Sequence, residues 1–220
     1  MTEIAAPAAP TLRGNYYSSR EYLSTDVKTG VTRNRAGTRM ICLTRDFLLG
    51  LRTALVTECG PAADTVFKTC GRTWGGQFAR RFEKELSEYY GMSLSDFAMG
   101  MFQACLAEAF GRHGWGRLTV DFSRHEQGLF VAELDGAVYA ELVETSDRPV
   151  ESLTAGILAG VFTHLSGQDL DCVQTACKAC GAPTSRFVIG LKARVEPAEA
   201  MVAAGKGHDE IVAALAASRA

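Results

Sequence analysis

The chain has 220 residues, of which 47% are hydrophobic and 22% are charged, and its formal net charge at pH 7 is −2. This size and composition allow one domain with a substantial core. The charge balance lacks the basic excess that a phosphate backbone attracts, so no nucleic-acid partner is expected. No apolar run approaches the ~18 residues of a membrane span, and residues 1–13 lack the pattern of a signal peptide, so we expect a cytoplasmic protein without a transmembrane segment.

The N-terminal region divides by composition. Residues 1–13 are rich in Ala and Pro, which predicts a flexible tail. Residues 14–37 are polar and aromatic without a helical period, which predicts an extended arm that lies against another surface, such as a second subunit. Residues 38–43 are apolar and partly β-branched and indicate a strand, and a helix is expected over 44–58.

A long helix is expected after Pro61, where apolar residues recur at steps of three and four. The apolar stripe comprises Val66, Phe67, Cys70, Trp74, Phe78, Phe82 and Leu86. Gly71, Gly75 and Gly76 fall within this pattern although glycine weakens helices, so we expect another backbone or a ligand to approach closely there. The charged residues that follow predict a solvated helix face: Arg80, Arg81, Glu83, Lys84 and Glu85.

The second half of the chain predicts two more helices and a hairpin. A mostly apolar helix follows Ser93, which has the spacing of a capping box with Asp96. Alternating residues over 117–124 and 129–134 predict an antiparallel hairpin. Residues 152–167 are rich in Gly and Ala, which favours a helix packed closely against a sheet or a twin helix.

A second hairpin and a helical C-terminus complete the expected elements. Residues 170–177 and 185–191 predict two strands, with the sequence KACGAPT between them. Residues 196–218 predict one or two surface helices interrupted at Gly205 and Gly207.

Three of the seven cysteines, Cys172, Cys177 and Cys180, fall within nine residues. Their C-x4-C-x2-C spacing is that of three ligands of a plant-type iron–sulfur cluster, but no fourth Cys follows. A C-x2-C pair at a hairpin tip is also a common half of a zinc site, which needs four donors. A third interpretation is reduced thiols packed as small hydrophobic side chains, since an odd cysteine count does not favour a disulfide framework.

The order of these C-terminal features resembles a known family. The Gly-rich helix AGILAGVFTHLSG, the strand VQTAC, the C-x2-CG tip and the strand SRFVIG are similar to the C-terminal half of the 4-vinyl reductase domain, most clearly over residues 150–191. That family includes bacteriochlorophyll-synthesis proteins, phenol-responsive sensor domains and hydrocarbon-binding proteins. The resemblance implies an α/β (α+β) fold like the TRAPP core, in which an antiparallel sheet packs with long helices, and it implies a homodimer with an apolar pocket.

The resemblance also bears on metal binding. The positions that hold zinc in the sensor members correspond here to Glu151, Gln174, Cys177 and Ser185, of which Gln and Ser are poor zinc donors. This implies that the family's zinc site is lost or is rebuilt. The candidate metal ligands are therefore Cys172, Cys177, Cys180 and Glu151.

Aromatic and Met side chains on the two long helices and nearby segments suggest an apolar cavity for a flat ligand, although any one of them can equally be core. The candidate binding residues are Trp74, Phe78, Met101, Phe102, His113, Trp115 and Phe130. The chain has no G-x-S-x-G turn, phosphate loop or dinucleotide fingerprint, so no catalytic residue is assigned and 4-vinyl reductase activity is implied by the family name alone.

The sequence therefore predicts a ligand-binding domain of the 4-vinyl reductase type over 38–192, preceded by the arm and followed by a helical extension over 193–220. The expected function is binding of an apolar small molecule, first of all a tetrapyrrole or its precursor, by a carrier, sensor or assembly factor in pigment metabolism such as bacteriochlorophyll synthesis. One alternative is a redox protein or reductase with a metal or iron–sulfur cluster on the three cysteines. Another is a scaffold with a filled pocket that binds a protein partner through residues 14–37 or the C-terminal helices.

Overall fold

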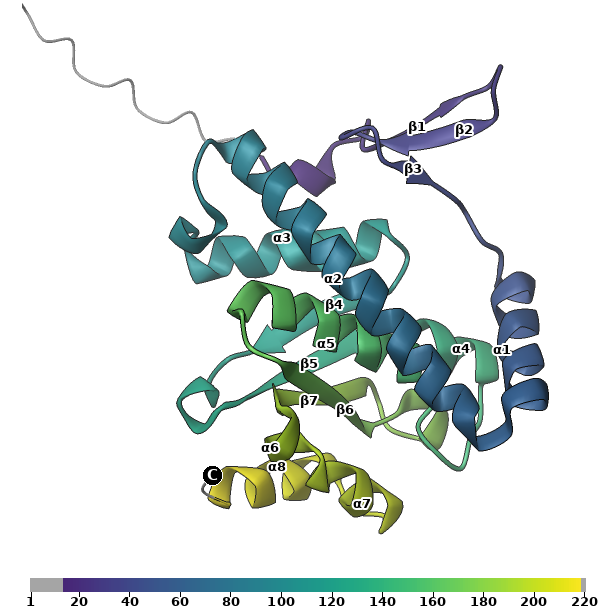
Figure 1. Cartoon of the computed structure of the whole chain (residues 1–220), viewed down its shortest axis with the longest axis vertical. Helices are drawn as coiled ribbons and strands as arrows, with labels where there is room; N and C mark the ends of the chain where they lie inside the picture. Colours follow the sequence, from purple (N-terminus) through teal and green to yellow (C-terminus); the bar gives the residue numbers. More distant parts are fainter. Residues whose placement is uncertain (1–13, 219–220) are drawn as a thin grey trace, which may run out of the picture.

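Two antiparallel sheets and a set of long helices form the structure, a computed structural model that describes residues 14–218 (Figure 1). The small sheet has the order β1-β2-β3 and the larger one the order β4-β5-β7-β6. The strands are β1 (Leu23–Asp26), β2 (Val31–Asn34), β3 (Arg39–Met40), β4 (Arg117–Asp121), β5 (Leu129–Asp135), β6 (Leu170–Ala176) and β7 (Ser185–Leu191). The predicted mixed α/β fold is confirmed. The predicted tail, residues 1–13, lies outside the described residues.

Eight α-helices and five short 3-10 turns are found among the described residues. The α-helices are α1 (Arg45–Cys59), α2 (Ala63–Tyr90), α3 (Met99–Arg112), α4 (Val138–Val143), α5 (Ser152–Ser166), α6 (Lys192–Val195), α7 (Pro197–Ala203) and α8 (His208–Ala217). The 3-10 turns are η1 (Tyr16–Ser18), η2 (Gly60–Ala62), η3 (Leu94–Asp96), η4 (His125–Gln127) and η5 (Lys178–Cys180). None of these helices combines the length and the apolarity that crossing a bilayer requires.

Glycines bring α2 and α5 into backbone contact. A Cβ atom added at Gly75 would lie 3.0 Å from the Cα of Ile157 on α5, and one added at Gly71 would lie 2.9 Å from the Ile157 backbone nitrogen. Gly156 and Gly160 on α5 approach the backbone of α2 in the same way. The predicted close approach is therefore confirmed, and the second backbone is that of the Gly- and Ala-rich helix, which lies beside α2 (Figure 1).

The four-stranded sheet has helices on both faces, because side chains alternate across a strand. Phe187 and Ile189 of β7 join the main core with α2, α3 and α5. Val188, between them, packs into a second apolar cluster with Ile211 and Leu215 of the C-terminal helices. Both predicted hairpins are present, and β5 pairs with β7 to join them into one sheet.

The arm packs on its own chain. Tyr16, Tyr17 and Tyr22 are buried against the C-terminal part of α2 and against α3, at 5%, 1% and 1% exposure. The Arg112 side chain of α3 donates from Nε to the Tyr17 carbonyl at 2.8 Å. Beyond Tyr22 the β1–β3 sheet is mostly exposed and stands away from the body of the molecule (Figure 1). The expected supporting surface for the start of the arm is thus the chain itself.

Three local predictions were wrong. The strand expected over 38–43 shrinks to β3, because Ile41 and Leu43 leave the sheet and are 76% and 51% exposed. Ser93 does not cap the apolar helix; its hydroxyl contacts Ser95 and a 3-10 turn precedes α3. Helix α4 was not expected at all, since six residues give too short a period to recognise.

Candidate functional site

The largest apolar space lies between one face of α2 and the arm. This arm cavity has a volume of about 1,030 Å³. Its inner wall is α2 from Thr65 to Glu85 together with His113 and Trp115, and its outer wall is the arm and the segment that follows it. The outer residues are Tyr17, Tyr22, Asn34, Thr38, Arg39, Met40, Ile41 and Leu43.

Stacked aromatic rings form the centre of the inner wall. The rings of Trp74 and Phe78 stack with centroids 5.2 Å apart, and the Trp115 ring lies 5.3 Å from that of Trp74. The His113 imidazole meets Phe78 edge to face at 5.4 Å. Such walls suit a ligand with an apolar or aromatic body, because ring contacts supply area without requiring hydrogen bonds.

Two polar groups interrupt this aromatic wall. The Nδ1–H of His113 donates to the Ala109 carbonyl at 2.7 Å, and the Nε2 atom accepts from the Tyr22 hydroxyl at 3.4 Å. Burial lowers the pKa of His113, so the imidazole is neutral at pH 7. The indole Nε1–H of Trp115 is buried and has no hydrogen-bond partner within residues 14–218. A buried donor without a partner costs free energy that an acceptor on a ligand would recover.

A buried carboxylate closes one end of the arm cavity. Glu85 is 8% exposed and accepts from Asn34 Nδ2 at 3.2 Å and from the Tyr17 hydroxyl at 3.4 Å. Burial raises the pKa of Glu85, because the charged form loses hydration. Glu85 was predicted to lie on a solvated face. That prediction was wrong because residues 51 and 68 positions away along the chain cover it.

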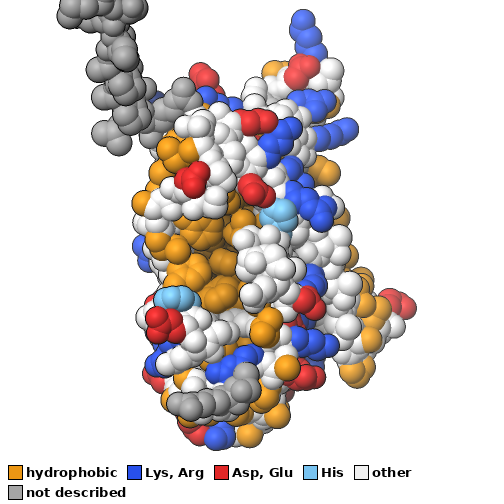
Figure 2. Space-filling view, turned by 60° about the vertical axis from the view of Figure 1, so that its left-hand side comes forward, with side chains coloured by type: hydrophobic (Ala, Val, Ile, Leu, Met, Phe, Trp, Pro, Cys, Tyr) orange, Lys and Arg blue, Asp and Glu red, His pale blue; other side chains and the backbone are white. Residues whose placement is uncertain are grey.

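A separate hollow lies on the side of the molecule with α3 and the β4–β5 turn, where Figure 2 shows hydrophobic side chains gathered around a depression. Phe102, Phe122 and Phe130 are partly exposed here, with Phe122 and Phe130 centroids 5.3 Å apart. Phe162 of α5 lies 4.7 Å from Phe130. None of these rings has a polar partner of the kind that Trp115 and His113 present, so we rank this hollow below the arm cavity.

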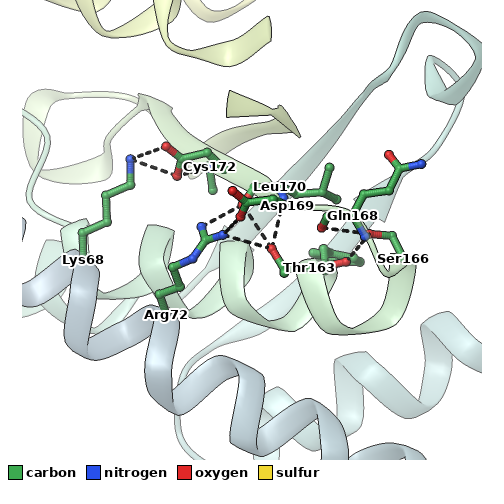
Figure 3. Close-up of polar contacts among 10 residues, drawn as sticks. Lys68, Arg72, Thr163, Ser166, Gln168, Asp169, Leu170 and Cys172 are labelled. Carbon is green, nitrogen blue, oxygen red and sulfur yellow. Dashed lines mark hydrogen bonds and ion pairs between the residues drawn. The ribbon is translucent and has the colours of Figure 1, made fainter. Parts of the chain in front are cut away.

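A second cavity of about 780 Å³ lies between α2, β6 and the C-terminal helices, and its cations are already paired. Lys68 contacts the Asp171 carboxylate at 3.1 Å. Arg72 pairs with Asp169 and donates to the Leu170 carbonyl at 2.7 Å (Figure 3). The pairing neutralises this polar groove internally and ties α2 to the start of β6.

The residues that correspond to the family's zinc positions form a hydrogen-bond network. Glu151, which is fully buried, accepts from the Ala140 backbone N–H at 2.7 Å and from the Thr154 hydroxyl. Its own backbone N–H donates to Gln174 Oε1 at 2.9 Å, and Gln174 Nε2 reaches Ser185 Oγ at 3.4 Å. Burial raises the pKa of Glu151. This donor set satisfies itself and does not suit zinc, which prefers charged or imidazole ligands.

The cysteines predicted as metal ligands lie in different surroundings. Cys172 is fully buried in β6, and Cys177 is buried at the tip of the hairpin. Cys180 is exposed and contacts the Cys177 thiol, and partial burial together with that contact raises its pKa to about 11. The described part of the chain contains no group of three or more His, Cys, Asp or Glu side chains arranged to hold a metal ion.

The structure divides the predicted binding residues into two groups. Trp74, Phe78, His113 and Trp115 meet in the arm cavity. Phe102 and Phe130 lie in the α3 hollow, joined through Phe122. Met101 is partly buried against the main core. The sequence did not point to Glu85, Arg81 or the arm residues, because their place in the cavity depends on contacts distant in the chain.

Comparisons with known proteins agree with this fold. Residues 130–191 match the family model of the 4-vinyl reductase domain. The phenol-responsive sensory domain of the transcription activator PoxR, crystallised with phenol, is similar with a TM-score of 0.65 at 21% identity, over 83% of this chain and 90% of that chain. No curated protein sequence matches the chain significantly.

Two other solved structures are more distantly similar. A vinyl-4-reductase family protein from Methanocaldococcus jannaschii gives a TM-score of 0.48 at 15% identity, over 68% of this chain and 82% of that chain. A trafficking protein particle complex subunit 3 from Naegleria fowleri, covalently bound to palmitic acid, gives 0.47 at 16% identity, over 67% and 95%.

The fold and the site define an α+β domain in which an antiparallel sheet is covered by long helices and an aromatic cavity adjoins the longest helix. Over residues 130–191 this domain is a 4-vinyl reductase domain, which confirms the resemblance seen in the sequence.

Proposed function

We propose that the protein binds an apolar small molecule reversibly in the arm cavity. The observation behind this proposal is the aromatic wall of Trp74, Phe78 and Trp115 together with the buried, unpartnered Nε1–H of Trp115. A ligand with an apolar body and one oxygen acceptor would bury its surface on the rings and satisfy that donor. The PoxR sensory domain, which shares the fold and was crystallised with phenol, supports this class of ligand.

The biological role that we propose is that of a carrier, sensor or assembly factor. A tetrapyrrole or its precursor remains the first pigment-related candidate, because such molecules combine a large apolar body with oxygen acceptors. An absorption spectrum of the protein isolated from its source would test it: a bound tetrapyrrole gives a Soret band, and a colourless protein argues against it. We propose no reductase activity.

A homodimer is part of the proposal. Helix α1 has no buried residue, and Phe47 and Leu51 on it are 55% and 43% exposed, as are Ile41 and Leu43 just before it. A helix of 15 residues is marginal alone, so a covering surface would stabilise it. A second copy fits the implied dimer, whereas the exposed β1–β3 sheet and the C-terminal helices are the surfaces we propose for another protein. Light scattering of the purified protein distinguishes a dimer from a monomer.

The metal-containing redox alternative depends on Cys172, Cys177 and Cys180. Elemental analysis of protein prepared without a metal-binding tag tests it directly. Zinc or iron near one equivalent per chain, lost on substitution of Cys177 by Ser, would favour this alternative. We expect less than about a tenth of an equivalent, because Cys172 is buried apart in β6 and the tip offers two thiols.

The test of ligand binding compares two matched ligands and two matched variants by calorimetry. The ligands are 4-propylphenol and propylbenzene, which differ by one hydroxyl group. Trp115→Phe keeps an aromatic ring and removes the indole N–H, so we expect affinity for 4-propylphenol to fall by about fivefold to tenfold, as one net hydrogen bond predicts. Affinity for propylbenzene should change little, and Trp74→Phe should weaken both ligands alike. Failure of wild-type protein to bind either ligand would contradict the proposal.

A further inference from the structure

The arm cavity is long and narrow. Its α2 wall runs from Thr65 to Glu85 with lining residues on every turn, which at 1.5 Å per residue is about 30 Å. A volume of 1,030 Å³ over about 30 Å gives a mean cross-section of about 34 Å². An α-helix, with a diameter of about 10–12 Å, needs more than twice that area. The cavity is therefore one extended chain wide, with its open end near Ile41, Leu43 and Val66, which are exposed.

The polar groups of the cavity leave donors in excess. The acceptors are occupied: Glu85 accepts from Tyr17 and Asn34, and His113 Nε2 accepts from Tyr22. Two donors remain, the Trp115 indole N–H and the guanidinium of Arg81. Arg81 is half-buried in the cavity wall and makes no hydrogen bond or ion pair with any residue from 14 to 218.

The unpaired state of Arg81 contrasts with the cations elsewhere on α2. Lys68 and Arg72, on the opposite side toward β6, both have carboxylate partners. Glu85 lies one turn from Arg81 but makes no ion pair with it, since its oxygens face the arm. A guanidinium in an aromatic, partly desolvated wall favours a planar anion that can accept two hydrogen bonds.

We propose that the ligand of the arm cavity is an elongated amphipathic carboxylate, with its carboxylate on Arg81 and its apolar chain along α2 toward Val66. This proposal rests on the proposed function and specifies its ligand class. The closed, polar end of the cavity near Glu85 receives the head group, and the aromatic and aliphatic side chains between Phe78 and Val66 bury the chain.

The experiment uses the fluorescence of Trp74 and Trp115, which are the two tryptophans of the chain and both line the cavity. The probes are dodecanoate, octanoate and 1-dodecanol, kept below their micelle concentrations, and protoporphyrin IX as a wide dicarboxylate measured by its own absorption. We expect dodecanoate to bind at least about tenfold more tightly than 1-dodecanol, because only the acid pairs with Arg81. Octanoate should bind more weakly than dodecanoate, and protoporphyrin IX should bind more weakly than both.

Adjacent arginines provide the matched variants. Arg81→Gln should weaken dodecanoate by about tenfold and leave 1-dodecanol unchanged, whereas Arg80→Gln, at an exposed neighbouring position, should change neither by more than about twofold. Arg81→Lys, which keeps the charge, should retain most of the preference even if the Gln variant folds poorly.

The outcomes separate this inference from the proposed function. Equal binding of dodecanoate and 1-dodecanol, equal effects at Arg80 and Arg81, or tighter binding of protoporphyrin IX would overturn the inference and leave the apolar cavity standing. No binding of any probe would overturn both.

Discussion

Substitution of Gly75 by Ala tests the packing that shapes the cavity-bearing helix. A Cβ at this position would lie 3.0 Å from the Cα and carbonyl carbon of Ile157 and closer still to the carbonyl oxygen, whereas ordinary carbon contacts are about 3.5–4.0 Å. Helices α2 and α5 must therefore separate by at least about 0.5–1 Å along a face where the two backbones touch. Overpacking of this kind costs about 1–3 kcal/mol or more, against a gain of about 1 kcal/mol in helix propensity.

Gly76 is the matched control. A Cβ there would meet no atom nearer than 4.0 Å, so Gly76→Ala keeps the gain in helix propensity without a clash. Urea unfolding followed by circular dichroism should place the Gly75→Ala midpoint about 1 M below that of Gly76→Ala, given a typical slope of about 2 kcal/mol/M. Equal midpoints, or a Gly75→Ala protein more stable than wild type, would refute the close approach of α2 and α5.

Two further predictions follow from buried titratable groups. Because burial raises the pKa of Glu85 above its ordinary 4.5, its contribution to folding stability is present at low pH and lost as pH rises through the folded-state pKa; Glu85→Gln should therefore gain stability relative to wild type as pH rises, and a difference that does not change with pH would contradict this. Thiol titration of the native protein should modify exposed Cys42 and Cys70 first and Cys180 more slowly, since its pKa is about 11, and complete protection of Cys180 that a chelator removes would instead support a metal at the hairpin tip.

The sequence predicted elements whose physical cause is local. The α2 stripe, the two hairpins and the Gly-rich α5 all rest on periodicity or composition within one segment. The pairing of β5 with β7 joins Phe130 to Ile189, so no local pattern could reveal it. The failure at 38–43 has a similar cause, because an apolar and β-branched run predicts a strand only when a partner strand is available.

The candidate site shows the same limit. Trp74 and Phe78 were recognisable from the helical stripe, and the structure brings His113 and Trp115 to them from the end of α3. Arg81 and Glu85 lie in a charged run that is typical of a solvated face. They line a cavity because Tyr17, Tyr22 and Asn34 of the arm fold back over α2, and such coverage depends on contacts between distant segments.

The location of the bound ligand tests the central claim most directly. Photoaffinity labelling with an alkylphenol whose chain has a diazirine, followed by peptide mapping, would identify the residues within reach of the probe. We predict labels within 65–85 of α2 and within 38–43 after the arm, suppressed by excess 4-propylphenol. Suppressible labels confined to α3 and the β4–β5 turn, around Phe102 and Phe130, would contradict the account and move the binding site to the other apolar hollow.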